Sequence, residues 1–183
     1  MAAQPAEPIA VVGVEVRRWR PEDASALHVL VLANLEHLRP WMPWVAGEPL
    51  TFAERCGLVE TWMTAWDAGS DFSFAIVDAA GGELLGACGA HRRIGPGGLE
   101  VGYWVRSDRT GRGVASAAVG AVVGAVSTVD GVDRLEIHHD AANLASGRVA
   151  EKAGFSRIEE HPDEVSAPGE IGIEVVWRLD LTT

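Results

Sequence analysis

The chain has 183 residues, of which 48% are hydrophobic and 22% are charged, proportions typical of one globular domain rather than of a disordered or fibrous protein. Its formal net charge of −11 argues against nucleic acid as a ligand, because phosphate backbones are bound by clustered lysine and arginine side chains. The same charge favours a basic or amine-bearing partner.

A strand and a helix are the first elements that the sequence predicts, after a flexible start over residues 1–11. Alternating apolar side chains indicate an edge strand over residues 12–19. The string Arg20-Pro21-Glu22-Asp23 then places proline and acidic residues in the first turn of a helix, which is the position that both favour. This helix is expected to end near Pro40.

A loop and a second helix follow. Residues 38–44 hold two tryptophans and two prolines, which predicts an irregular segment with a rigid apolar surface. Thr51 is expected to cap a helix that runs to about Ala68, because Glu54 lies three residues further on and completes a capping box.

Three strands and a buried helix form the middle of the chain. The strands are expected over residues 72–77, 84–93 and 99–105, and the short glycine-rich links between them are typical of antiparallel neighbours. The helix is expected over residues 113–128. It is rich in alanine and valine nearly all round, so it should be buried.

The last elements complete the predicted fold. They are a strand over 133–139, a short helix over 146–153, a strand over 155–158, a polar loop over 161–169 and a final strand over 171–181. The order predicts a mixed α/β fold with a mostly antiparallel sheet and helices on both faces. No long linker interrupts it, so residues 12–183 are expected to form a single domain.

The cysteines and the apolar segments predict a cytoplasmic protein. Cys56 and Cys88 are far apart, so a disulfide framework or a cysteine zinc site is not expected. The start of the chain lacks a basic segment followed by an apolar core, which argues against a signal peptide. The most apolar stretch, Val114–Val126, is shorter than the roughly 20 residues that span a bilayer.

The strongest motif is Gly111-Arg112-Gly113, between a predicted strand and the buried helix. The first N–H groups of a helix lack intrahelical partners, and glycine lets a phosphate approach the backbone closely. Three arginines, Arg106, Arg109 and Arg112, lie on this turn in an otherwise acidic chain. The motif therefore predicts an anion site. The alternative from the residues alone is a tight turn with solvated arginines.

Two other nucleotide-binding folds do not fit this motif. No Gly-x-x-x-x-Gly-Lys-Ser/Thr string occurs, which excludes a P-loop. A dinucleotide fingerprint needs glycine or alanine where Ser116 stands, and it needs the preceding strand to open a parallel unit.

Three motifs in order resemble the GNAT superfamily of N-acetyltransferases, and within it the ribosomal-protein-alanine (Rim-type) branch. They are Gly102-Tyr-Trp-Val105, Gly111-Arg-Gly-Val-Ala115 and the segment from Asn143 through Ser146 to Phe155. The resemblance implies the GNAT fold, acetyl-CoA as co-substrate and transfer of an acetyl group to a primary amine. Thr110 stands where the family usually has glutamine or arginine, a small departure because the loop binds through backbone N–H groups.

The resemblance also implies which residues bind the cofactor. The pyrophosphate should lie on the loop Thr110, Gly111, Arg112, Gly113, Val114 and Ala115. The pantetheine arm should pair with the strand edge at Trp104, Val105 and Arg106 and accept a hydrogen bond from Asn143.

Two residues are candidates for the chemistry. Glu100 matches a family position that often holds a catalytic carboxylate, and we take it as the candidate base; the alternative is a solvated glutamate at a strand end. Ser146 is the candidate acid near the cofactor sulfur, and its alternative is a helix N-cap, which uses the same hydroxyl. The N–H of Val105 is a candidate donor to the oxyanion.

The acceptor side is less specific in sequence. Trp41 and Trp44 are expected to wall the acceptor pocket, and the alternative is that they pack in the core. His138 or its neighbour His139 could reach this pocket, with His138 as the candidate, and the alternative is an ordinary structural histidine. His91 and Cys88 are taken as structural residues. No histidine has a partner at metal-ligand spacing, so no metal is expected.

The partner that these residues predict is an amine, either a protein N-terminus or a small molecule, bound by a monomer or homodimer. Neither nucleic acid nor a membrane is expected as a partner. The alternative function is a GNAT-fold module that senses acyl-CoA without turnover.

Overall fold

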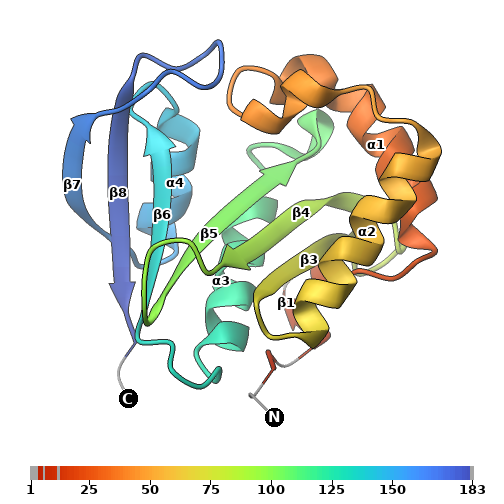
Figure 1. Cartoon of the computed structure of the whole chain (residues 1–183), viewed down its shortest axis with the longest axis horizontal. Coiled ribbons are helices and arrows are strands. Elements are labelled where there is room, and N and C mark those ends of the chain that lie inside the picture. The colour runs from red at the N-terminus through yellow and green to blue at the C-terminus, as the bar shows by residue number, and fades with distance from the viewer. Residues whose placement is uncertain (1–3, 6, 12, 182–183) are drawn as a thin grey trace.

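The computed structural model describes residues 4–5, 7–11 and 13–181. In these ranges eight strands form one sheet with the order β1-β2-β3-β4-β5-β6-β8-β7 (Figure 1). The strands are β1 (Ile9–Val11), β2 (Val14–Arg18), β3 (Asp71–Asp78), β4 (Leu84–His91), β5 (Gly98–Val105), β6 (Arg134–Asp140), β7 (Ser156–Pro162) and β8 (Ile173–Asp180). All neighbours are antiparallel except β5 and β6, which are parallel.

Helices cover both faces of the sheet (Figure 1). They are α1 (Asp23–Leu38), α2 (Phe52–Asp67), α3 (Val114–Val126) and α4 (Leu144–Lys152), with the short 3-10 helices η1 (Pro43–Gly47) and η2 (Ser107–Arg109). The central strand β3 is buried on both faces because its side chains alternate between two cores. Phe74 and Ile76 pack in the core that contains α3, whereas Ala75 and Val77 pack with Leu27 of α1.

The predicted fold class is confirmed, as is the start of the second helix. The Thr51 hydroxyl accepts from the Glu54 N–H at 3.3 Å, and the Glu54 carboxylate accepts from the Thr51 N–H at 2.7 Å. This reciprocal pair satisfies two N–H groups that the first turn leaves without partners. No helix in the described ranges is both long and apolar enough to cross a membrane.

Most predicted bounds agree with the structure to within about two residues, and the larger differences are at three places. Ile9–Val11, inside the segment expected to be flexible, forms a strand that pairs with β2, and Val12 lies outside the described residues. Because β1 and β3 flank β2, the prediction that this segment is an edge strand is wrong. The last helix begins at Leu144 rather than Ser146 because Asn143 is its N-cap. β7 extends to Pro162, into the expected loop, since pairing with β8 continues to Ile173.

Candidate active site

The parallel strands β5 and β6 separate partway along their length (Figure 1). They pair only from Gly98 to Glu100, although β5 continues to Val105 and β6 continues to Asp140. Beyond Glu100 the facing edge of β5 therefore has no strand beside it. Backbone N–H and C=O groups on such an edge are free to pair with another extended molecule.

A cavity of about 900 Å³ opens at this separation. Its wall includes seven of the residues that the sequence singled out: Trp41, Trp44, Glu100, Trp104, His138, Asn143 and Ser146. The other cofactor candidates, from Val105 to Ala115, are not in the cavity wall; they lie at the far end of β5 and at the start of α3. The predicted residues thus fall into a cavity and an adjoining loop, joined by one strand.

The predicted anion loop has the backbone geometry that its glycines suggested. Gly111 and Gly113 have φ angles of 71° and 83°, a conformation that residues with a side chain rarely adopt. Gly113 is the N-cap of α3, and no side chain caps this helix. Residues 111–113 are exposed. The first N–H groups of α3, including those of Val114 and Ala115, therefore remain available to an anion.

The arginines of this turn differ in their contacts. Arg106 and Arg109 both form ion pairs with Glu83, and Arg106 also pairs with Asp108. Arg112 is exposed and forms no ion pair within the described part of the chain. The Arg112 guanidinium is thus the loop's available cation, whereas Arg106 and Arg109 help to fix the turn.

Helix α1 holds the turn from the other side. The Asn34 side chain, which is buried, accepts from the Ser107 N–H at 2.9 Å and donates to Leu30 O at 2.8 Å. The Thr110 hydroxyl donates to Ser107 O at 2.8 Å, so Thr110 closes the turn rather than pointing a free hydroxyl at a ligand. Asn34 is a residue that sequence reasoning missed, because its partner lies 73 residues away.

The free backbone groups on β5 are not all those that the sequence predicted. The Arg106 N–H donates to Leu85 O at 2.8 Å and its carbonyl accepts from Arg109 at 3.1 Å, so the backbone of Arg106 is occupied. Because backbone groups alternate along an antiparallel strand, those of Trp104 also face β4, while those of Tyr103 and Val105 face the open edge. His37 already contacts Val105 O at 3.2 Å. The prediction that Trp104 and Arg106 pair with the pantetheine through their backbone groups is therefore wrong, whereas Val105 faces the open edge as predicted.

Tyr103 and Ser146 form a hydroxyl pair across the site. The Tyr103 hydroxyl lies 2.8 Å from Ser146 Oγ and donates to Ser146 O at 3.1 Å. Burial raises the pKa of Tyr103 far above its usual range, so the phenol keeps its proton. The alternative that Ser146 is a helix N-cap is wrong, because Asn143 has this position and accepts from the Ser146 N–H at 3.2 Å. Tyr103 is a second residue that sequence reasoning missed.

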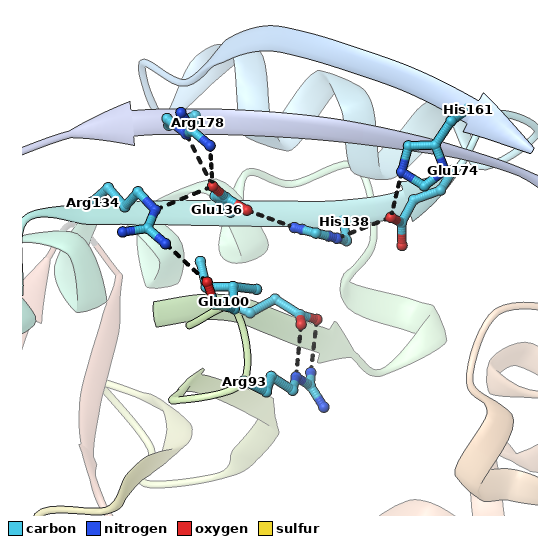
Figure 2. A network of polar contacts seen from close by, with 9 residues as sticks. Arg93, Glu100, Arg134, Glu136, His138, His161, Glu174 and Arg178 are labelled. Atoms are coloured by element: carbon cyan, nitrogen blue, oxygen red, sulfur yellow. Dashed lines mark hydrogen bonds and ion pairs between the residues drawn. The ribbon is translucent and has the colours of Figure 1, made fainter. Parts of the chain in front are cut away.

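Glu100 does not present a free carboxylate. Arg93 donates to both of its oxygens, at 2.7 and 2.8 Å, in a two-pronged ion pair (Figure 2). The Glu100 side chain is 19% exposed and that of Arg93 is 57% exposed. An amine that approaches Glu100 therefore meets an ion pair at the cavity wall, and its proton would compete with Arg93 for the carboxylate.

On the neighbouring strand β6, His138 lies between two carboxylates (Figure 2). Its Nε2 is 3.0 Å from Glu136 and its Nδ1 is 3.2 Å from Glu174. Burial alone would raise the pKa of Glu136, but the hydrogen bonds from His138 and Arg178 outweigh this and lower it. His138 is thus in the cavity wall, as predicted, with both ring nitrogens engaged.

Two loops bring the apolar wall and the polar rim together. Trp44 lies 6.1 Å from Trp104 between ring centroids, and both Trp41 and Trp44 line the cavity. The Gly169 N–H donates to Pro40 O at 2.9 Å, which ties the loop between β7 and β8 to the tryptophan segment. The cavity wall therefore contains both aromatic side chains, such as Trp41 and Trp44, and acidic side chains, such as Glu174.

The comparisons with known proteins agree with this geometry. A family model described as an acetyltransferase (GNAT) domain matches residues 14–156. No curated protein gives a significant match to the sequence. Among solved structures, RimL, a ribosomal L7/L12 alpha-N-protein acetyltransferase in complex with coenzyme A, has a TM-score of 0.86 at 21% identity, over 96% of this chain and 98% of that chain.

Two further structures have the same fold. The ribosomal-protein-S5-alanine acetyltransferase from Vibrio fischeri has a TM-score of 0.84 at 18% identity and covers 96% of this chain and 97% of its own. Mycobacterium smegmatis RimJ in complex with a CoA-disulfide has a TM-score of 0.78 at 23% identity, over 98% of this chain and 86% of that one. With the family model matching most of its length, this chain belongs to the GNAT acetyltransferase family.

Proposed function

We propose that this chain is an N-acetyltransferase that moves an acetyl group from acetyl-CoA to a primary amine while both substrates are bound. The observation that carries the proposal is the separation of β5 and β6 beyond Glu100, next to a helix whose N-terminus no side chain caps. The open edge of β5 would pair with the extended arm of the cofactor, and the uncapped N-terminus of α3 next to it would bind the pyrophosphate. Residues 12–183 would form this enzyme as a single acetyltransferase domain.

The residues present fit acetyl-CoA in three places. The first N–H groups of α3, at Val114 and Ala115, would donate to the pyrophosphate, and Arg112 would add its charge. The open edge of β5 at Tyr103 and Val105 would pair with the pantetheine amides. The Asn143 side-chain oxygen caps α4, and its NH₂ group remains to donate to the same arm.

The hydroxyl pair would serve the leaving group. When the amine nitrogen bonds to the acetyl carbon, the carbon–sulfur bond breaks and the sulfur leaves as a thiolate, which needs a proton. The neutral Tyr103 phenol would give that proton, and Ser146 Oγ, 2.8 Å away, would orient it. The Tyr103 N–H on the open β5 edge would stabilise the negative charge that develops on the carbonyl oxygen, because the Val105 N–H, the candidate from sequence, would pair with the pantetheine.

The acceptor would be an amine-bearing molecule, and we favour a protein N-terminus. Acidic side chains such as Glu100 and Glu174 line the cavity, and they attract an ammonium group. Residues of the tryptophan segment and of the loop between β7 and β8 both line the cavity, and an extended chain end would enter between them. Solved structures with the same fold are named as acetyltransferases of ribosomal proteins, which supports a protein acceptor here as well. Glu100 stays our prediction for the carboxylate that meets the amine.

The experiment is an assay of CoA release with a panel of amines. Purified protein would be incubated with acetyl-CoA and unblocked peptides that begin with alanine or serine, the same peptides with a blocked N-terminus, and small amines. Release of CoA with the unblocked peptides alone supports the proposal. If acetyl-CoA binds in a calorimeter but no amine in the panel causes release of CoA, the result would contradict the proposal and favour an acyl-CoA sensor.

A further inference from the structure

Three histidines line the cavity, and they differ in which ring nitrogens are engaged: His91, His138 and His139. Both nitrogens of His138 have carboxylate partners. His139 Nδ1 donates to Asp140 O at 2.7 Å, and its Nε2 accepts from Trp177 at 2.9 Å. His91 has one partner, and its Nε2 makes no hydrogen bond within the residues that the structure describes.

The partner of His91 fixes the role of each ring nitrogen. Asp71 Oδ1 lies 2.6 Å from His91 Nδ1, and the two residues are register partners on β3 and β4. An ionised carboxylate only accepts hydrogen bonds, so Nδ1 carries the proton and donates it to Asp71. In the neutral ring Nε2 then carries the lone pair. This histidine–carboxylate arrangement orients a general base in other enzymes.

Two glycines leave space for the imidazole ring of His91 beside the cavity. A Cβ on Gly89 would lie 2.4 Å from His91 Nε2, so only glycine leaves room for the ring there. A Cβ on Gly102 of β5 would lie 3.9 Å from the same nitrogen. Gly102 directly precedes Tyr103 and lies beyond the segment that pairs with β6. His91 Nε2 therefore faces the part of β5 where the cofactor's reactive end is proposed to lie.

We propose that His91, oriented by Asp71, is the general base that takes the proton of the acceptor amine; this rests on the proposed acetyltransferase function. The bound ammonium group first releases one proton to solvent and becomes a neutral amine, and a second proton passes from the nitrogen to His91 Nε2 as the carbon–nitrogen bond forms. The carbon–sulfur bond breaks, and the thiolate takes its proton from Tyr103. Exchange of protons with solvent afterwards returns His91 and Tyr103 to their starting states. Glu100, which accepts hydrogen bonds from Arg93 on both oxygens, attracts the incoming ammonium group electrostatically but does not take a proton from it.

This assignment moves the base role from the residue that the sequence favoured. Glu100 lies opposite His91 in the register of β4 and β5, so both face the same side of the sheet. Of the two, His91 has an unoccupied acceptor atom, whereas each oxygen of Glu100 already accepts a hydrogen bond from a guanidinium group. The sequence alone gave no reason to prefer His91, because Asp71 lies 20 residues before it.

The test compares His91→Ala with Glu100→Gln in the intact protein, with acetyl-CoA and an unblocked alanine-initiated peptide, both saturating. His91→Ala should lower kcat by about 100-fold or more, with unchanged affinity for acetyl-CoA. Added imidazole should restore part of this loss and should leave the wild type and Glu100→Gln unaffected. Glu100→Gln should act mainly on KM of the peptide. His28→Gln, in α1 outside the cavity wall, is the histidine control.

A second variant guards against a folding defect. Gly89→Ala keeps His91 but pushes its ring away from the site, so kcat should fall while circular dichroism and acetyl-CoA binding stay as in the wild type. Turnover of His91→Ala within about threefold of wild type, or a loss that appears in Glu100→Gln instead, would overturn the proposal. If the wild-type chain releases no CoA with any amine, the proposed function itself fails, and His91 has no reaction to serve.

Discussion

Replacing Tyr103 by phenylalanine removes one oxygen atom from the site and leaves the packing of the ring in place. The lost hydroxyl contacts Ser146 at two points, Oγ at 2.8 Å and the carbonyl at 3.1 Å. Burial raises the pKa of Tyr103, so the phenol is protonated throughout the pH range of an assay. The substitution therefore separates proton donation from structure.

The two effects of Tyr103→Phe differ greatly in size. Loss of the two neutral hydrogen bonds to Ser146 should lower the free energy of unfolding by about 2 kcal/mol, which lowers the melting temperature of a chain of this length by about 4–8 °C. Loss of a general acid should lower kcat by about 10²–10⁴-fold. Affinity for acetyl-CoA should stay the same, because the hydroxyl acts on the leaving thiolate.

The assay is steady-state release of free CoA thiol at saturating acetyl-CoA and peptide, with thermal melts of the same samples. Ser146→Ala is the matched variant: it keeps the phenol and removes only its partner, so its kcat should fall less than that of Tyr103→Phe. A Tyr103→Phe protein that melts as expected but turns over within about threefold of wild type would refute the acid role.

Three further predictions concern the cofactor loop, the N-cap of α4 and the buried thiol of Cys88. Gly113→Ala should weaken acetyl-CoA binding measured by calorimetry, because a residue with a Cβ in the left-handed conformation costs about 1–2 kcal/mol. Gly120→Ala, in the middle of α3, should bind acetyl-CoA as the wild type does, and equal affinities of the two variants would contradict the prediction. Asn143→Ser should keep the cap and the melting temperature but weaken acetyl-CoA binding, whereas Asn143→Ala should lower both; a serine variant with full affinity would remove Asn143 from the cofactor site. Burial raises the pKa of the Cys88 thiol to about 12, so the unfolded chain releases this proton at lower pH than the folded chain. The free energy of unfolding measured in urea should therefore be unaffected below about pH 8.5 and should fall as pH rises toward 12. It should fall less steeply with pH in Cys88→Ala, and the same pH dependence in both proteins would contradict the assignment.

Local sequence patterns predicted the parts of the fold that depend on near neighbours. The capping box of Thr51 and Glu54 involves residues three apart, and its hydrogen bonds are those expected. The glycine pair around Arg112 likewise predicted the left-handed turn before α3, because positive φ angles select glycine. Glycine-rich links correctly indicated that β3, β4 and β5 are antiparallel neighbours.

The parts that sequence missed depend on register and on distant partners. The Tyr103–Ser146 pair joins residues 43 apart, and no pattern in either segment points to the other. The Arg93–Glu100 ion pair depends on how the chain returns between β4 and β5. Serine at position 146 is a suitable helix cap by its chemistry, yet Asn143, three residues earlier, has an equally suitable side chain and occupies the cap.

The position of the transferred acetyl group on the product shows directly whether this chain acetylates an α-amine. The protein would be incubated with acetyl-CoA that carries an isotope-labelled acetyl group and with an unblocked peptide that begins with alanine and contains an internal lysine. Fragmentation of the product by mass spectrometry then shows which nitrogen carries the label. The proposed function predicts one labelled acetyl group on the α-nitrogen, in an amount equal to the CoA released. An unlabelled peptide, with acetyl-CoA bound but intact, would contradict it.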